Sequence, residues 1–296
     1  MRTFSSIFKF TSIIIASVFA AALVIMMPAV AVDGSPPGLF ELEGNTLDDS
    51  GAGLPDDWAA LYNGGANNGG SPIAFTGILP DFNDPDADTS VFWKGGSKDI
   101  HDVSSWGHKS GNTQPKDQIQ NAYAAAYVVE AGMATPTHQA GDLIIYFGLD
   151  RLANNGDAFA GFWFFQDPAI GETEQQFTGN HVAKSAMGAG DLLMLVEYPQ
   201  ASNAIPRIQG YEWAPNDFDN DGNLDAEGHA LGPLDLVFDS ETGIGGIGGD
   251  PTCDGSGNKV ACAITNSGSV PVPWPYADKT GPLNSIPFES FYEGGV

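Results

Sequence analysis

The stretch that decides the fold reads Gly141-Asp-Leu-Ile-Ile-Tyr-Phe-Gly148, then Ala153-Asn-Asn-Gly-Asp157, then Ala158-Phe-Ala-Gly-Phe-Trp-Phe-Phe-Gln166. Two apolar runs rich in β-branched and aromatic side chains flank a segment of turn-forming residues, which is typical of two β-strands and their connection. An Asn-Gly pair between two strands favours a tight hairpin. The stretch therefore predicts that 143–148 and 158–166 pair as antiparallel strands.

The second of these runs carries large side chains on both of its faces. Side chains alternate along a strand, which places Phe159, Trp163 and Phe165 on one face and Phe162 and Phe164 on the other. A strand that is apolar on both faces is usually buried on both. We therefore expect 158–166 to be a central strand with its aromatic row in the core, and a platform for stacking sugars is the alternative.

The same alternation of short apolar runs and turn-forming residues continues through the rest of the sequence. The whole chain has 38 glycines and 20 prolines, many of which lie between these runs. This pattern predicts an all-β fold. Alanines in 118–130 suit a helix, but large and small residues alternate there with period two, so we predict a strand. The simplest architecture is one two-sheet antiparallel sandwich over 32–296, jelly-roll or concanavalin-like, with long Gly/Asp-rich loops. Two small sandwiches divided near 197–203 are the alternative. Further strands are predicted at 39–42, 73–78, 90–93, 192–198, 205–213, 234–238 and 260–264.

The N-terminus has the features of a secretory signal peptide. Arg2 and Lys9 precede a largely apolar stretch over 11–27, and Ala29-Val-Ala31 supplies a small-residue cleavage pattern. We expect 1–31 to be removed and the mature chain to be secreted, extracellular or at the cell surface. A membrane anchor is the alternative, since about 17 apolar residues approach the lower limit for a bilayer span. No later apolar stretch is long enough, so we expect no membrane insertion of the mature chain.

The composition is strongly acidic. The 296-residue chain has 37 acidic and 11 basic residues and a net charge of −26, and loss of Arg2 and Lys9 with the leader makes it −28. Such a charge disfavours nucleic acid and anionic membranes as partners. A hydrophobic content of 42% argues against disorder. The only cysteines, Cys253 and Cys262, are expected to form a local disulfide in an oxidising compartment.

The clearest candidate site is Asp217-Phe-Asp219-Asn-Asp221-Gly-Asn223-Leu-Asp225. Alternating carboxylates followed by a glycine are how a short loop surrounds a hard cation with oxygen ligands, so the pattern predicts a Ca²⁺ site. The ligands would be Asp217, Asp219, Asp221, Asn223 and Asp225. A helix–loop–helix hand would have a glutamate at the twelfth position, where Gly228 stands instead. The alternative is a set of solvated turns, which Asp, Asn and Gly also favour.

No catalytic motif accompanies this loop. The five histidines lack zinc-type spacing, and a Gly-x-Ser-x-Gly nucleophile motif is absent. Paired carboxylates for glycosidic cleavage remain an alternative, because the separation of acids in space is not visible in a sequence.

Several phrases occur together in a recognisable order. They are Gly38-Leu-Phe-Glu-Leu-Glu-Gly44, Asp56-Asp57-Trp58, Gly95-Gly-Ser-Lys-Asp99, Asn121-Ala-Tyr-Ala-Ala-Ala-Tyr127, the segments 141–148 and 153–157, and Gly161-Phe-Trp-Phe-Phe-Gln-Asp167. On these phrases the chain resembles the N-terminal β-domain of large bacterial secreted or cell-surface proteins of poorly characterised function. The resemblance implies no catalytic residues, and the Asp217 loop looks like an insertion relative to it. In such proteins more chain follows the segment similar to Phe291-Tyr-Glu-Gly-Gly295, so we expect the sequence to be a C-terminally truncated fragment.

These observations favour a non-enzymatic secreted or cell-surface module, stabilised by calcium, for adhesion or for contact with a glycan, matrix or surface protein. A secreted carbohydrate-active enzyme, a glycoside hydrolase or lyase on a jelly-roll fold, is the first alternative. A structural spacer of a larger exoprotein is the second.

Overall fold

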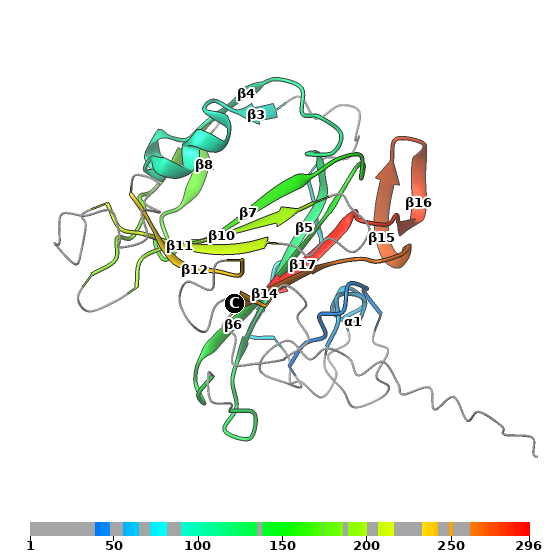
Figure 1. Cartoon of the computed structure of the whole chain (residues 1–296), viewed down its shortest axis with the longest axis horizontal. Helices are drawn as coiled ribbons and strands as arrows, with labels where there is room; N and C mark the ends of the chain where they lie inside the picture. Colours follow the sequence, from blue (N-terminus) through cyan, green and yellow to red (C-terminus); the bar gives the residue numbers. More distant parts are fainter. Residues whose placement is uncertain are drawn as a thin grey trace, which may run out of the picture.

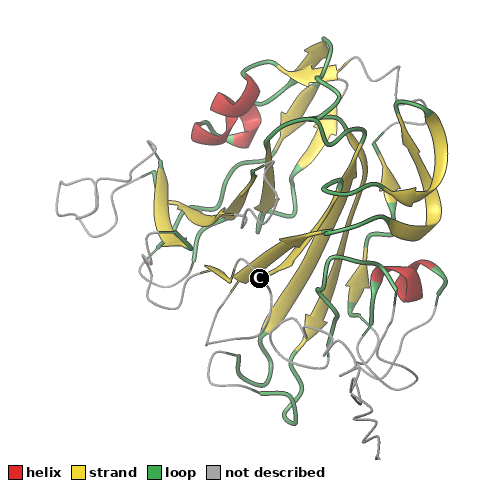
Figure 2. Ribbon diagram, turned by 45° about the vertical axis from the view of Figure 1, so that its right-hand side comes forward, coloured by secondary structure: helices red, strands yellow, loops and turns green. Residues whose placement is uncertain are grey.

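The structure, a computed structural model, describes residues 39–47, 56–64, 72–81, 90–134, 138–173, 175–185, 189–199, 207–215, 233–241, 249–250 and 261–296. In this part of the chain the fold is mostly β, with antiparallel sheets (Figures 1 and 2). The described helices are short: α1 spans Trp58–Tyr62, and two 3₁₀ helices, η1 and η2, span Gly95–Ile100 and Val103–Ser105. The predicted all-β class is confirmed at this level.

The larger sheet has seven strands in the order β1-β5-β6-β17-β14-β13, and β2 also pairs with β5. Its pairings are antiparallel apart from that of β13 with β14. The bounds are β1 Ala74–Phe75, β2 Leu79–Pro80, β5 Ile119–Val128, β6 Leu143–Arg151, β13 Gly249–Asp250, β14 Ala261–Thr265 and β17 Phe291–Gly295.

The second sheet has four antiparallel strands in the order β12-β11-β10-β7. They are β7 Ala158–Phe164, β10 Leu192–Tyr198, β11 Arg207–Trp213 and β12 Leu234–Asp239. Three strand pairs complete the described set: β3 Ser90–Phe92 with β4 His108–Ser110, β8 Gly171–Thr173 with β9 Gln176–Thr178, and β15 Val270–Asp278 with β16 Gly281–Ile286.

The predicted hairpin between 143–148 and 158–166 is wrong. β6 pairs with β5 on one edge and with β17 on the other, whereas β7 pairs with β10 in the second sheet. A strand has only two edges, so β6 has none left for β7. The Asn-Gly segment connects the two sheets instead, and Gly156 takes a φ of +126° at that connection.

The structure also corrects the place of β7, which lies at the edge of its sheet and not at the centre. Ala158 and Ala160 are buried, but Phe159 is 63% exposed and Trp163 and Phe165 are half-buried. Two other expectations are confirmed. The alternating segment 118–130 forms the strand β5, and the strands predicted at 192–198 and 205–213 form β10 and β11, which pair with each other.

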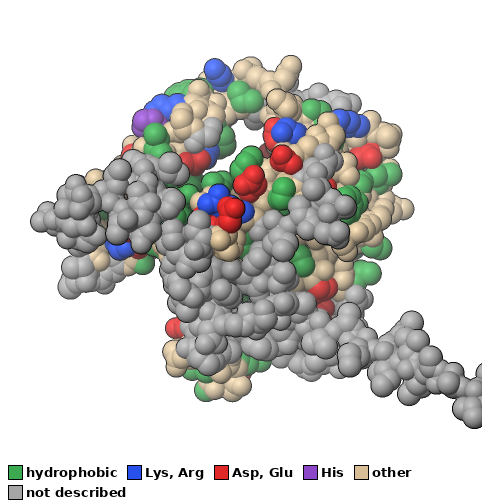
Figure 3. Space-filling view, in the orientation of Figure 1, with side chains coloured by type: hydrophobic (Ala, Val, Ile, Leu, Met, Phe, Trp, Pro, Cys, Tyr) green, Lys and Arg blue, Asp and Glu red, His purple; other side chains and the backbone are tan. Residues whose placement is uncertain are grey.

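Alternation along the strands of the larger sheet separates two cores. One face presents Tyr123, Tyr146 and Phe291 to a cluster that includes Phe40 and Trp58 from the N-terminal part of the described chain. The other face contributes to a cluster shared with the four-stranded sheet, whose members are Phe147, Leu149, Ala158, Ala160, Met194, Val196, Tyr198, Ile208, Phe238, Ala261, Ala263 and Tyr292. The space-filling view shows a hollow between β3 and β4 above and β7 below (Figure 3).

Several sequence predictions fall outside the described residues. These are the calcium loop at 217–225, the leader 1–31 and Cys253. Cys262 lies buried in β14. The loop, the leader, the disulfide and the single domain over 32–296 therefore stay predictions. Among the described residues no helix combines the length and the apolar character that a membrane crossing requires.

Candidate metal centre

Three carboxylates gather where the segment 39–47 meets the start of α1. Glu41, Glu43 and Asp57 each place a carboxylate oxygen within 4.8 Å of the other two. Glu41 and Asp57 are fully buried, and Glu43 is half-buried. This acidic group could hold a metal ion, and both carboxylate oxygens of Glu43 are buried although the residue as a whole is half-buried.

The backbone brings the two segments of this group together. Phe40 and Asp56 form a parallel β-bridge, and the Glu41 N–H donates to the Asp56 carbonyl at 2.9 Å. Asp57 caps α1, because its Oδ1 accepts from the Trp58 N–H. Glu41 and Glu43 are two residues apart in a non-helical segment, so their side chains can lie on the same side of the chain.

A fourth carboxylate, that of Glu293 on β17, holds this segment to the sheet. Its Oε1 accepts from the Gly44 N–H at 2.6 Å, and its Oε2 accepts from the Trp58 indole N–H at 2.8 Å. Gly44 has a φ of +78°, a conformation that glycine adopts without strain. Glu293 thus fastens both halves of the acidic group to the centre of the larger sheet.

Burial and the repulsion between like charges raise the pKa of two of these acids, Asp57 and Glu293. Burial, then the like charges of Glu293, Glu43 and Glu41, hold the pKa of Asp57 well above its ordinary value. Burial raises the pKa of Glu293 to about 8, although the hydrogen bonds from Gly44 and Trp58 oppose the shift. The Oδ2 of Asp57 is buried and has no hydrogen-bond partner among the residues that the structure describes. A bound cation or a shared proton would relieve this arrangement.

The donor set indicates which cations fit. The three groups offer carboxylate oxygens and no sulfur or imidazole. Hard cations such as Ca²⁺ and Mg²⁺ prefer oxygen ligands, whereas zinc and copper sites favour cysteine and histidine. The chemistry of the group therefore fits a hard divalent cation.

The metal site predicted from the sequence consists of other residues. Asp217, Asp219, Asp221, Asn223 and Asp225 lie outside the described residues, and the acidic group that the structure brings together was not predicted as a site. Its members do occur in the phrases 38–44 and 56–58 that carry the family resemblance. The only local signal is a Glu-x-Glu pair followed by an Asp-Asp pair, because the bridge that joins them is a long-range contact.

A second buried carboxylate lies on the same face of the larger sheet. Asp150 on β6 accepts from the Asn121 amide at 2.9 Å and from the Trp274 indole at 3.1 Å. Burial raises its pKa to about 7, and these hydrogen bonds oppose the shift. The neighbouring Tyr123 hydroxyl is buried, and no residue in the described part of the chain forms a hydrogen bond with it. Asp150 is fully buried, so it joins β5, β6 and β15 internally.

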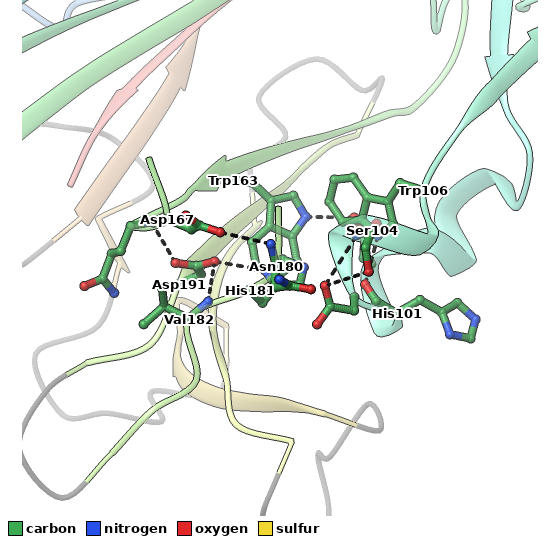
Figure 4. A network of polar contacts seen from close by, with 12 residues as sticks. His101, Ser104, Trp106, Trp163, Asp167, Asn180, His181, Val182 and Asp191 are labelled. Carbon is green, nitrogen blue, oxygen red and sulfur yellow. Dashed lines mark hydrogen bonds and ion pairs between the residues drawn. The ribbon is translucent and has the colours of Figure 1, made fainter. Parts of the chain in front are cut away.

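The third polar network surrounds a histidine (Figure 4). The Nδ1 of His181 lies 3.0 Å from the Oδ2 of Asp191, and the other oxygen of Asp191 accepts from the Gln166 N–H at 2.8 Å. The ring stacks on Trp213 with centroids 4.1 Å apart and lies 4.4 Å from Trp163. Burial lowers the pKa of His181, and the hydrogen bond with Asp191 opposes the shift.

This histidine cluster also fastens the segment that carries η1 and η2. The Trp106 ring packs edge-on against Trp163 and His181, and the Trp163 indole donates to Asp99 at 2.8 Å. Lys98 pairs with Asp99 and lies 4.6 Å from the centre of the Trp106 ring. The hydrogen bond described for His181 is with Asp191, and its ring packs against Trp106, Trp163 and Trp213.

Comparisons with known proteins add no family to these findings. No family model, no curated protein and no solved structure matches the chain.

Proposed function

We propose that this chain is an exported, non-enzymatic β-module in which calcium at Glu41, Glu43 and Asp57 fastens the N-terminal segment to the larger sheet. The module makes adhesive contact with an extracellular glycan, matrix or surface protein. The observation that carries the proposal is the convergence of three carboxylates within 4.8 Å, two of them fully buried. Bringing them together stabilises the fold only when their charges are neutralised.

Calcium is favoured over magnesium by the shape of the group. Ca²⁺ accepts irregular sets of six to eight oxygens, whereas Mg²⁺ requires near-octahedral geometry and retains its waters. Carboxylates from two separate segments, one of them half-buried, suit the less demanding ion. Secretion supports the same choice, because extracellular modules bind calcium with Kd values of roughly 10⁻⁴–10⁻³ M.

We also propose that the two larger sheets form a jelly-roll or concanavalin-like sandwich. Supporting this arrangement, side chains of β6, β14 and β17 share one apolar cluster with side chains of the four strands of the second sheet. Sheets packed face to face form such a shared core.

Two observations favour binding over hydrolysis. Glycosidases need one carboxyl group with a raised pKa in reach of substrate. Asp150 and Glu293 have raised pKa values, but both are fully buried and already accept hydrogen bonds from indole groups. These two acids therefore support an internal structural role. Release of reducing sugar from soluble polysaccharides would establish the glycoside hydrolase alternative.

The proposal is tested by the melting temperature with calcium and with chelator. About 10 mM calcium should stabilise the fold by about 1–3 kcal/mol, which raises Tm by roughly 3–10 °C. Glu43→Gln should remove most of this rise, since it deletes one ligand charge at a half-buried position. Asp219→Asn in the predicted loop is the matched control and should retain the rise. A calcium effect lost in Asp219→Asn but kept in Glu43→Gln would assign the ion to the loop, and no calcium effect in the wild type would overturn the proposal.

A further inference from the structure

The outer face of the four-stranded sheet carries an ordered row of exposed and half-buried side chains. Glu197 on β10 is paired with Phe159 of β7 on one side and with Arg207 of β11 on the other. The next row on the same face pairs Leu195 with Gly161 and Gln209. Side chains directly opposite each other in antiparallel strands lie close together on one face.

This face is turned away from the core that the two sheets share. Ala158 and Ala160 of β7 enter that core, so the alternating residue Phe159 lies on the opposite face. Phe159 is 63% exposed, the largest exposed fraction among the big hydrophobic side chains of the described chain. A Cβ at Gly161 would meet only Leu193 at 3.5 Å and Leu195 at 4.0 Å. Because Gly161 has no side chain, no side chain at this position rises above the sheet next to the phenyl ring, and a flat group can lie there.

The polar end of the row is held in place by Asp239 on the neighbouring strand β12, which is paired with Gln209. Asp239 is fully buried and accepts from the Arg207 guanidinium, with Nε at 3.1 Å from Oδ1. The same carboxylate accepts from the Gln209 amide at 3.2 Å. Arg207 also pairs with Glu241 at 3.1 Å, yet its side chain keeps 31% of its surface exposed. These contacts fix the orientation of two hydrogen-bonding side chains before any ligand arrives.

The side chains of this face are buried at one end of the sheet and exposed at the other. Leu193, Tyr211 and Trp213 are buried beneath Trp163 near the histidine cluster. Exposure increases toward Phe159 at the start of β7. In Figure 3, hydrophobic, acidic and basic side chains lie next to one another around the hollow between β3–β4 and β7.

We propose that this face binds a neutral polysaccharide, with one pyranose ring stacked on Phe159 and its hydroxyl groups bonded by Glu197, Arg207 and Gln209. The inference rests on the glycan contact of the proposed function and names its site. A pyranose has an apolar C–H face, and its hydroxyls both donate and accept hydrogen bonds. An exposed ring beside one carboxylate acceptor and two sets of N–H donors matches both properties.

The charge of the protein selects the class of glycan. The net charge of −26 repels polyanions such as acidic polysaccharides. Glu197 stands at the centre of the row, and the positive charge of Arg207 is already paired with Asp239 and Glu241. A neutral chain can thus use the row without a repulsive contact.

The test is binding of the full chain to soluble neutral polysaccharides, namely mixed-linkage β-glucan, dextran, galactomannan and arabinoxylan, by affinity electrophoresis in calcium. Polygalacturonate is the acidic comparison. We expect retardation by at least one neutral polysaccharide, with an affinity that falls about tenfold or more in Phe159→Ala. Gln209→Ala should weaken the same interaction. Tyr62→Ala, which removes a 42% exposed aromatic ring from α1, is the matched control and should bind as the wild type does.

The outcomes separate this inference from the proposed function. Binding to none of the neutral polysaccharides, binding to polygalacturonate alone, or equal affinity of Phe159→Ala and the wild type overturns the inference. The calcium-dependent rise in Tm is measured on the same samples. If that rise is present while glycan binding is absent, the calcium-stabilised module stands and the sugar site fails. If the rise in Tm is absent while Phe159-dependent binding is present, the sugar site stands and the calcium-stabilised module fails.

Discussion

Raising the pH in the absence of calcium should destabilise this protein between about pH 6.5 and about pH 9. Glu293 and Asp150 have folded-state pKa values of about 8 and about 7, above their ordinary values of 4.5 and 3.8. An acid whose folded pKa is raised binds its proton more tightly in the folded state. Its contribution to stability is therefore lost as the pH rises through the folded value. His181 titrates with the opposite sign below its ordinary value of 6.5, so the measurement starts there.

The size of the effect follows from these values. Proton loss over this interval costs about 2 kcal/mol at Glu293 and about 1 kcal/mol at Asp150, given about 1.4 kcal/mol for each pKa unit. The combined loss of about 3 kcal/mol corresponds to a fall in Tm of roughly 6–12 °C. Calcium at the acidic group lowers the pKa of its carboxylates by attraction, so the loss should shrink when calcium is present.

The assay is thermal unfolding followed by circular dichroism across this pH interval, with chelator and with calcium. Glu293→Gln is the informative variant, because removing the titrating group should remove about two thirds of the loss calculated for Glu293 and Asp150, even though the variant starts from a lower Tm. A Tm that is constant or rises toward about pH 9 in chelator would refute the reasoning about these buried acids.

Three further changes test other parts of the account. Gly44→Ala should destabilise the fold by about 1–3 kcal/mol in urea unfolding, because the residue has a φ of +78° and a new Cβ would lie 2.9 Å from the Thr265 carbonyl oxygen; stability like that of the wild type would show that the segment can move aside. Trp274→Phe should cost about 1–3 kcal/mol above the pKa of Asp150 and less at low pH, since it removes an indole donor from that carboxylate. His181→Phe should reduce the loss of stability on acidification below pH 6.5, since burial disfavours the charged ring, and an unchanged acid limb of the Tm profile would contradict this.

The sequence predicted the type of structure better than the pairing of its strands. Period-two alternation identified β5 despite its alanines, because local burial alone produces that pattern. The Asn-Gly segment after β6 misled the prediction. Its turn chemistry is local, whereas the occupation of both β6 edges by β5 and β17 depends on residues far away in the chain.

The candidate site likewise depends on a long-range contact that local sequence patterns do not reveal. A metal loop made of consecutive residues is visible in a sequence, which is why the metal site was predicted at Asp217–Asp225. The group at Glu41, Glu43 and Asp57 forms only when a β-bridge joins Phe40 to Asp56. Nor can alternation alone distinguish a buried aromatic from the exposed Phe159, because the answer depends on β7 being an edge strand.

The most direct test of the central claim is the position of a bound ion in crystals grown with terbium, a calcium substitute that anomalous diffraction locates. The account predicts an anomalous peak about 2.3–2.6 Å from carboxylate oxygens of Glu41, Glu43 and Asp57. Crystals containing terbium that show no peak at these residues, with the Asp57 carboxyl hydrogen-bonded to a neighbouring acid, would contradict it.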